Sequence, residues 1–354
     1  MRVFSLFIFR RSDQKLSSSI TSVNKIGFVA IDIEFDKEFA NPVTLLQIKL
    51  ENLLLKNGQE GKVSNLEPLT GGASAETWKF SFSTKKGSKN LILRKGSGKK
   101  SPLAVLKSEE AVIQQKVRES GAPVAEIVAI SKDEADLGDA YLMKLVPGES
   151  IARKILRDKR FESAREKLAF QCGKALATIH SVPIEDFKQV PKKSIEDELS
   201  RLYMTYKSFE QPSPVFEYAF KWLGGKDFSY RKDSLVHGDF RLGNLIVDEK
   251  GLAAVIDWEM VSIGNPLLDI GWMCVNSWRF GQSEKVVGGF GDLEELLAGY
   301  GSVSKEEISV EEVKIWQVLG SLRWGVICLI QAYSHLQGEV NSVEKAAIGR
   351  RVSE

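Results

Sequence analysis

The first half of the chain alternates apolar and polar residues in short runs separated by glycine-rich or basic turns. Such alternation predicts strands, and three of them lie between Asn65 and Arg94, in NLEPLTGGASAETWKFSFSTKKGSKNLILR. A helical period follows at 101–120, in SPLAVLKSEEAVIQQKVRES, and Gly121 gives a stop signal. Further short strands lead to AYLMKLVPGES, where Pro147 and Gly148 indicate a lobe boundary.

After this boundary the apolar residues recur mostly with a helical period, as in FESAREKLAFQCGKALATIH and across residues 194–223. The most apolar segment, WQVLGSLRWGVICLIQAY, is interrupted by Arg323 and predicts a buried helix rather than a membrane span. We therefore expect an α+β fold, with a small antiparallel-sheet N-lobe over 37–147 and a larger, mainly helical C-lobe over 148–354. Residues 1–36 stay unassigned.

Composition places this fold among ordinary globular proteins, because 43% of the 354 residues are hydrophobic and 27% are charged. The net charge of +2 gives no broad attraction for nucleic acid or an acidic membrane, and we expect neither as a partner. Cys172, Cys274 and Cys328 lie far apart without a C-x-x-C spacing, which favours a reducing cytoplasm. The apolar start, MRVFSLFIFRR, lacks a cleavage pattern and is not expected to be a secretory signal.

Three polar residues are set into the otherwise apolar stretch LVHGDFRLGNLIVDEKGLAAVIDWE. Two apolar runs, 245–247 and 252–256, flank a polar turn and predict a β-hairpin. Asn244 and Asp257 would then meet at its open end, and the loop carrying Asp239 leads into the same place. Two carboxylates and one amide oxygen suit Mg²⁺ beside phosphate, although each residue type alone also favours turns.

A narrow turn between the first two strands is a candidate phosphate contact. Gly71, Gly72 and Ser74 would let backbone N–H groups approach phosphate oxygens, although a plain hairpin turn explains these residues equally well. The basic loop GSGKKS at 96–101 fails as a P-loop, since Leu93 stands where the first glycine belongs.

A cation and a carboxylate follow this turn. Arg94 ends the strand LILR and Glu110 lies on the next helix, so an ion pair between them could hold the cation against nucleotide phosphates. Lys95 is the alternative cation. For either member of the pair alone, a solvated surface position is the simpler interpretation.

Taken in order, the glycine turn, strand cation, helix glutamate, HGDFRLGN and VIDWE resemble the protein-kinase-like phosphotransferases of the aminoglycoside phosphotransferase and choline kinase branch. The resemblance covers about residues 60–335 and implies a bilobal, protein-kinase-like fold. It implies that Asp239 orients a substrate hydroxyl and accepts its proton, while Asn244 and Asp257 hold Mg²⁺ on ATP.

Expectations also follow for four further residues. The connector YLMKLVPG would present backbone groups of Lys144 and Val146 to adenine. His237 is expected to brace the loop rather than to react. We favour Asp269 as a helix N-cap, whereas the resemblance suggests that it braces the catalytic loop.

Departures from protein kinases point to a small acceptor. Only 11 residues separate Asp257 from Asp269, which leaves no room for an activation segment. Gly238 replaces the arginine that would read a phosphorylated loop, and Trp258-Glu259 replaces Phe-Gly. The expected partner is therefore a small-molecule hydroxyl substrate, bound near the helices at 194–223 and 311–337.

The acceptor itself is indicated only by resemblance. HGDFRLGN, IDWE and SWRFG look most like the kinase domains that are fused to acyl-CoA dehydrogenases, which implies a hydroxyacyl-CoA or a similar metabolite. Aminoglycosides rank lower, because a cationic substrate wants an acidic pocket and only EDE at 196–198 is densely acidic. A pseudokinase that binds nucleotide without transfer is the other alternative. The oligomeric state is not indicated.

Overall fold

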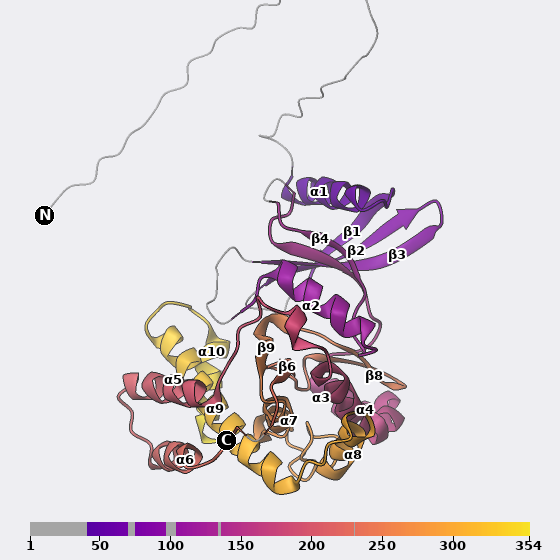
Figure 1. Ribbon diagram of the computed structural model, residues 1–354. Coiled ribbons are helices and arrows are strands. Elements are labelled where there is room, and N and C mark those ends of the chain that lie inside the picture. Colours follow the sequence, from indigo (N-terminus) through magenta and orange to yellow (C-terminus); the bar gives the residue numbers. More distant parts are fainter. Residues whose placement is uncertain (1–40, 70–74, 97–103, 134–135, 230) are drawn as a thin grey trace, which may run out of the picture. The chain divides into compact units, whose positions relative to one another are not determined.

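A five-stranded antiparallel sheet forms the N-lobe of the computed structural model (Figure 1). The structure describes residues 41–69, 75–96, 104–133, 136–229 and 231–354. The strands run in the order β1-β2-β3-β5-β4. Their bounds are β1 (Lys62–Pro68), β2 (Ala75–Thr84), β3 (Gly87–Gly96), β4 (Ile127–Ser131) and β5 (Ala140–Lys144). The three strands expected in the region up to Arg94 are confirmed.

Two helices cover this sheet. The first, α1 (Pro42–Lys56), was not predicted, and it buries Leu50, Leu53 and Leu54 in the apolar cluster of the sheet. The second, α2 (Lys107–Glu119), begins later than expected and lies between the sheet and the C-lobe (Figure 1). Because side chains alternate along a strand, Leu93 of β3 joins the α1 cluster while Arg94 points toward α2.

The larger lobe is mainly helical, as expected. Its helices are α3 (Ala152–Arg157), α4 (Glu162–His180), α5 (Ile195–Ser208), α6 (Pro214–Gly224), α7 (Leu267–Met273), α8 (Leu293–Ser304), α9 (Val310–Leu336) and α10 (Val343–Gly349). Its strands are β6 (Ser234–Val236), β7 (Leu245–Asp248), β8 (Gly251–Val255) and β9 (Ser262–Gly264). The helical stretch at 194–223 is divided into α5 and α6, and Pro214 occupies the first turn of α6, where its missing N–H costs nothing.

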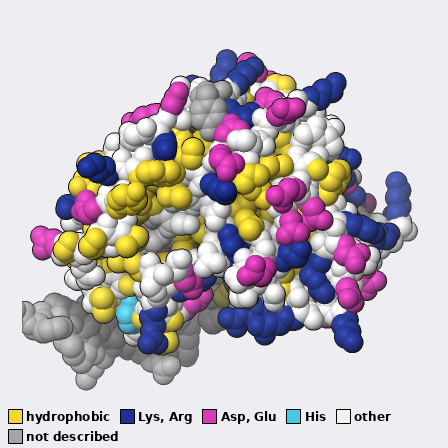
Figure 2. All heavy atoms as spheres, turned by 90° about the horizontal axis from the view of Figure 1, so that it is seen from below, with side chains coloured by type: hydrophobic (Ala, Val, Ile, Leu, Met, Phe, Trp, Pro, Cys, Tyr) yellow, Lys and Arg dark blue, Asp and Glu magenta, His cyan; other side chains and the backbone are white. Residues whose placement is uncertain are grey.

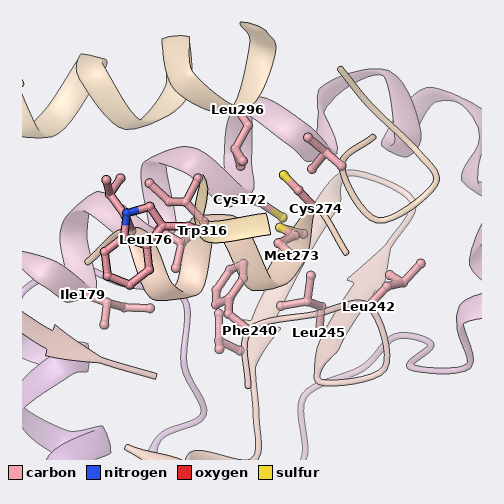
Figure 3. Packing of buried hydrophobic residues seen from close by; sticks show 14 of the residues in the cluster. Cys172, Leu176, Ile179, Phe240, Leu242, Leu245, Met273, Cys274, Leu296 and Trp316 are labelled. Atoms are coloured by element: carbon pink, nitrogen blue, oxygen red, sulfur yellow. The ribbon is translucent and has the colours of Figure 1, made fainter. Parts of the chain in front are cut away.

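The apolar core of this lobe anchors the loop that carries HGDFRLGN. Phe240 and Leu242 are both 0% exposed and belong to the same cluster as Leu176 and Trp316 (Figure 3). Burying each of these side chains contributes about 1.5–3 kcal/mol. These two side chains anchor the loop in the core, while Asp239, directly before Phe240, stays partly exposed.

Helix α9 runs through the C-lobe as a core helix. It is the one helix in the described part of the chain with the length and composition to cross a membrane, and 44% of its most apolar window is buried. It packs against α5, α6, α7 and α10. Arg323 in its middle donates to the Gly238 carbonyl at 3.2 Å, so the helix carries a polar group to the HGDFRLGN loop.

The surface carries mixed charges. On the face shown in Figure 2, Lys and Arg side chains are interspersed with Asp and Glu side chains, and apolar side chains lie between them. Tyr218, Leu336 and Val343 are among the exposed apolar residues, each more than 70% exposed. This face therefore shows no extended patch of one sign.

Candidate active site

The hairpin formed by β7 and β8 brings two of the predicted residues together. Leu245 pairs with Val255, and the Ile256 N–H donates to the Asn244 carbonyl at 2.9 Å, so Asn244 and Asp257 lie at the same end. This confirms the predicted hairpin. Within the described residues, the Asn244 amide oxygen and Asp257 Oδ2 accept no hydrogen bond. Two unengaged oxygens of this type fit the donors that Mg²⁺ accepts.

The backbone of Asp257 is strained. Its φ of 67° and ψ of 67° lie in the left-handed region, which costs a residue with a side chain about 1–3 kcal/mol. Trp258, the next residue, is fully buried. Such strain at a carboxylate is typical of functional sites.

Three donors hold the carboxylate of Asp239. Asn244 Nδ2 donates to Oδ2 at 2.6 Å, while Trp272 Nε1 and Arg241 Nε donate to Oδ1 at 2.8 and 3.0 Å. Sequence reasoning missed Trp272 and Arg241. The available signal for Trp272 was its position three residues after Asp269, since residues at that spacing share a face of a helix. The orientation of Asp239 is therefore fixed by its neighbours.

Asp269 braces the catalytic loop from α7. Its side chain is 0% exposed and accepts the backbone N–H groups of His237 and Gly238, both at 2.8 Å. The favoured interpretation as an N-cap is wrong, because Pro266 occupies the cap and Asp269 lies inside α7. Burial acts to raise the pKa of Asp269, but His180, His237 and the Gly238 N–H together outweigh it, and the pKa is lowered.

His237 has both ring nitrogens engaged. Nε2 lies 3.1 Å from the Ile256 carbonyl oxygen, and Nδ1 accepts the Asp239 N–H at 3.3 Å. These contacts require the neutral tautomer with its hydrogen on Nε2. The ring therefore joins the loop to the hairpin, in agreement with the expected bracing role.

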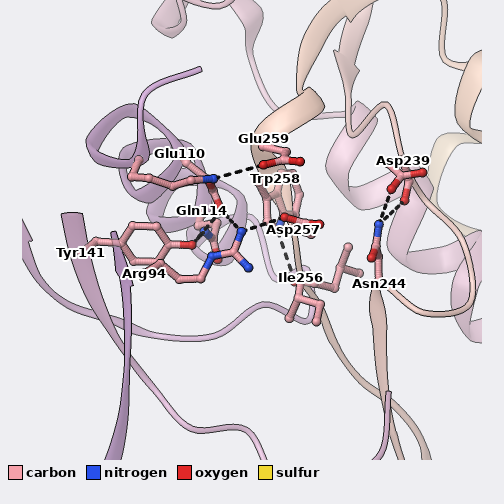
Figure 4. Close-up of polar contacts among 12 residues, drawn as sticks. Arg94, Glu110, Gln114, Tyr141, Asp239, Asn244, Ile256, Asp257, Trp258 and Glu259 are labelled. Atoms are coloured by element: carbon pink, nitrogen blue, oxygen red, sulfur yellow. Dashed lines mark hydrogen bonds and ion pairs between the residues drawn. The ribbon is translucent and has the colours of Figure 1, made fainter. Parts of the chain in front are cut away.

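Arg94 lies where the N-lobe meets Asp257 (Figure 4). Its Nη2 is 2.7 Å from Asp257 Oδ1 and 4.0 Å from Glu110 Oε1, so the expected pair with Glu110 is present but longer. Burial acts to lower the pKa of Arg94, but the carboxylate of Glu110, together with Asp257, raises it. Burial acts in turn to raise the pKa of Asp257, and Arg94 lowers it. The alternative cation, Lys95, pairs with Glu76 at 3.5 Å instead.

A second buried cation, Lys107, was missed by sequence reasoning. Lys107 is 4% exposed, and its Nζ lies 2.6 Å from Glu110 Oε2 and 3.4 Å from Glu259 Oε2. Tyr141 donates to the other oxygen of Glu110 at 2.7 Å. Lys107 therefore joins α2 to the segment that follows Asp257. Its position three residues before Glu110 on one helix was the available signal.

The structure describes the connector YLMKLVPG but not the glycine turn. Gly71, Gly72 and Ser74 lie outside the described residues. The Lys144 N–H donates to the Glu126 carbonyl at 2.9 Å, whereas the half-buried Val146 has no hydrogen-bond partner for its N–H within the described residues. An unpaired donor at this connector suits an acceptor nitrogen of a purine.

The segment between the metal-ligand candidate and α7 is short. A single 3₁₀ turn (Trp258–Met260) and β9 occupy it, and β9 pairs with β6. At Gly238, φ is +82° and a Cβ would meet the Met260 carbonyl oxygen. A side chain such as arginine would therefore not fit there without movement.

This combination of a braced aspartate loop, a hairpin carboxylate and a strand-borne cation matches a known family model. The model, described as phosphotransferase enzyme family, matches residues 65–305. The chain belongs to this family. Its protein-kinase-like α+β fold and its membership of the aminoglycoside phosphotransferase-like kinases are thereby established.

Curated relatives of this phosphotransferase match over part of their length. Acyl-CoA dehydrogenase family member 10 from Mus musculus is 29% identical over 230 residues, which are 61% of this chain and 21% of the relative. Family member 11 from Mus musculus is 30% identical over 53% of this chain and 25% of the relative. The chain thus spans about a fifth to a quarter of the relatives it matches.

Solved structures share the fold. A Ralstonia eutropha JMP134 protein assigned to the aminoglycoside phosphotransferases has a TM-score of 0.69 at 22% identity, covering 86% of this chain and 94% of that one. Spectinomycin phosphotransferase, in complex with ADP and spectinomycin, has a TM-score of 0.59 at 17% identity, covering 86% and 93%. A streptomycin-ATP complex of an aminoglycoside phosphotransferase has a TM-score of 0.53 at 15% identity, covering 85% and 97%.

Proposed function

We propose that this chain transfers the γ-phosphate of Mg-ATP to a hydroxyl group of a small molecule. The observation that carries the proposal is the meeting of Asp239, Asn244 and Asp257 at one end of the hairpin, with Arg94 beside them. Structural neighbours in ATP and ADP complexes support the choice of nucleotide. Family membership supports the reaction class.

The phosphate side of the reaction uses Arg94, Asn244 and Asp257. Asn244 and Asp257 would hold Mg²⁺ through their free oxygens, and the ion would supply positive charge beside the phosphates. Arg94, which pairs with Asp257, would contact the phosphate oxygens of the nucleotide. The Val146 N–H and the Lys144 backbone would meet adenine, and backbone N–H groups of Gly71, Gly72 and Ser74 would contact phosphate oxygens.

The acceptor side of the reaction uses Asp239. Its carboxylate orients the substrate hydroxyl and takes the proton as the hydroxyl oxygen bonds to the γ-phosphorus. The bond from that phosphorus to the bridging oxygen breaks, and ADP leaves. Because the transition state is loose, catalysis comes mainly from positioning, so the fixed geometry of Asp239 matters more than unusual basicity.

A hydroxyacyl-CoA is the first acceptor to test, because the curated relatives carry the names of acyl-CoA enzymes. Aminoglycosides are the alternative, since structural neighbours bind spectinomycin and streptomycin. A cytoplasmic location completes the proposal, because Cys172, Cys274 and Cys328 are all buried free thiols.

The test is transfer of labelled γ-phosphate from ATP into a low-molecular-weight metabolite extract, with and without Mg²⁺. A phosphorylated metabolite made only by the wild-type protein, and not by Asp239→Asn, supports the proposal, and mass spectrometry identifies it. Label on polypeptide would indicate a protein kinase. Nucleotide binding without transfer to any acceptor would favour a pseudokinase.

A further inference from the structure

Three cations gather around one carboxylate on the acceptor side of the catalytic loop. Glu198 of α5 lies 2.6 Å from Arg201 Nη2 and 3.8 Å from Arg323 Nε. Lys193, two residues before α5, is held by its backbone N–H on the Ile263 carbonyl at 2.9 Å. The glutamate and Arg323 are only 11% and 10% exposed, so this pair is shielded from water. We call Lys193, Arg201, Arg323 and Glu198 the acceptor-side cluster.

The cluster carries more positive charge than its own carboxylate neutralises. Within the described residues, the ammonium of Lys193 makes no hydrogen bond or ion pair, although Lys193 is half-buried. Burial and the guanidinium of Arg323 lower the pKa of Lys193 to about 8. Asp269 also attracts Lys193, but its oxygens are occupied by His180 and the loop N–H groups. A half-buried, unpaired ammonium beside two guanidiniums leaves room for an anionic partner.

The cluster is connected directly to the catalytic aspartate. Arg323 Nη1 donates to the carbonyl of Gly238, the residue before Asp239. The guanidinium of Arg323 also stacks over Trp272, 4.6 Å from the ring centroid, and Trp272 donates to Asp239. A cavity of about 10 Å³, with room for about one water molecule, is lined by Glu198, Trp272 and Arg323, among others. A ligand held by the cluster would therefore lie close to the reacting hydroxyl.

We propose that the acceptor-side cluster binds a negatively charged group, a carboxylate or a phosphate, on the molecule whose hydroxyl is phosphorylated. This inference rests on the proposed function and specifies its substrate class. Within the described residues, Arg201 keeps Nε and Nη1 for the oxygens of either group, since only its Nη2 donates to Glu198, and Arg323 keeps Nη2. Lys193 supplies the uncompensated charge. A polycationic acceptor such as an aminoglycoside would be repelled here.

Equilibrium dialysis with labelled glycerol, glycerate and glycerol 3-phosphate tests the proposal. The three probes share a hydroxyl and differ in charge, so glycerol is the neutral reference. Each is titrated up to about 50 mM, with and without saturating Mg-AMP-PNP, which fills the nucleotide phosphate site. We expect saturable binding of one or both anions and none of glycerol. Comparing glycerate with glycerol 3-phosphate decides between a carboxylate and a phosphate.

Matched variants assign the binding to the cluster. Lys193→Gln should raise the dissociation constant of the bound anion about tenfold or more, and Arg201→Gln should raise it less because Arg201 is 40% exposed. Lys192→Gln is the control, since Lys192 is 75% exposed and pairs with Asp233. Binding of labelled AMP-PNP, measured in parallel, checks that each variant is folded.

The outcomes separate this inference from the function on which it rests. Absence of saturable anion binding, equal binding of glycerol, or no change in Lys193→Gln overturns the subsite, while AMP-PNP binding leaves the phosphotransferase standing. Failure of AMP-PNP to bind the wild-type protein counts against the proposed function. Anion binding that depends on Lys193 would still support the subsite in that case.

Discussion

Two charged regions flank the HGDFRLGN loop, and their net charges have opposite signs. Beside the hairpin, two cations face three carboxylates, and we call this group the nucleotide-side cluster. Its members are Arg94, Lys107, Glu110, Asp257 and Glu259. It has a negative charge in excess, whereas the acceptor-side cluster has an excess of positive charge.

The opposite net charges indicate which kind of ligand each region can bind. A cluster with spare carboxylate charge suits a divalent cation, which arrives together with phosphates that Arg94 can engage. A cluster with spare ammonium charge suits an anion. Asp239 lies between them, so the two reactants would approach it from regions of opposite charge. The predictions below test this comparison.

Removal of the carboxylate between the two regions should have the largest effect. Asp239→Asn keeps the shape and can still receive the Trp272 and Arg241 hydrogen bonds, but it cannot take a proton. We expect phosphate transfer to fall about a thousandfold. Labelled-phosphate transfer gives the rate, and equilibrium dialysis should show nearly unchanged Mg-ATP binding. Asp233→Asn, at the exposed pair with Lys192, is the matched control. Equal activity of the two variants would remove Asp239 from its role.

Removal of the strand-borne cation should weaken the nucleotide side. Arg94→Ala leaves Asp257 and Glu110 without their shared partner and removes a phosphate contact. We expect kcat/KM for ATP to fall about a hundredfold, with a raised KM. Lys95→Ala, on the opposite face of β3, should change little because Lys95 pairs with Glu76. If Lys95→Ala were instead the damaging change, the assignment of the cation would be wrong.

The buried Lys107 should affect stability. Lys107→Met removes the partner of Glu110, which is 0% exposed, and leaves a buried carboxylate less compensated. We expect the free energy of unfolding to fall by about 2 kcal/mol, measured by urea denaturation. Lys116→Met on the same helix is the control, because the pair between Lys116 and Asp186 is partly exposed. A similar loss in both variants would contradict the structural role of Lys107.

The smallest expected effect is the change of anion affinity with pH at the acceptor-side cluster. With its pKa lowered to about 8, Lys193 is charged below that pH and neutral above it. Anion affinity should therefore fall about tenfold from pH 7 to pH 9, if only the ammonium form binds. Arg201, Arg323, Glu198 and Asp269 are the charged groups that face Lys193. Burial acts to raise the pKa of Glu198 and of Asp269, but Arg323 and Arg201 lower the first, and His180, His237 and the Gly238 N–H lower the second.

Dialysis of the bound anion across this range gives the profile. Lys193→Gln should flatten it, because the titrating group is gone. A profile that keeps its slope in that variant would assign the titration to another group.

Local pattern was enough to predict the hairpin and the three N-terminal strands. Period two and turn residues specify such elements within a few positions, and the hairpin then brings Asn244 to Asp257. The contacts of Trp272 and Lys107 could not be predicted in this way, because they depend on how α7 and α2 pack against distant loops. Helix α1 was missed, since no chemical motif drew attention to it.

Asp269 shows where propensity misleads. An aspartate near the start of a helix is most simply read as a cap, and only the folded arrangement shows that its oxygens bind the loop 32 residues earlier in sequence. The resemblance suggested the correct role because it carries information about tertiary contacts. The domain boundary expected at 147–148 stays a prediction.

The left-handed backbone of Asp257 implies a trade-off between the stability of the fold and its activity. Glycine accepts this conformation without penalty, so a purely structural optimum at this position would lack a side chain. The chain instead retains a carboxylate in an unfavourable conformation, at the point where Arg94 meets it. Selection for heat resistance alone would therefore favour glycine here, and it would remove the carboxylate on which the proposed chemistry depends.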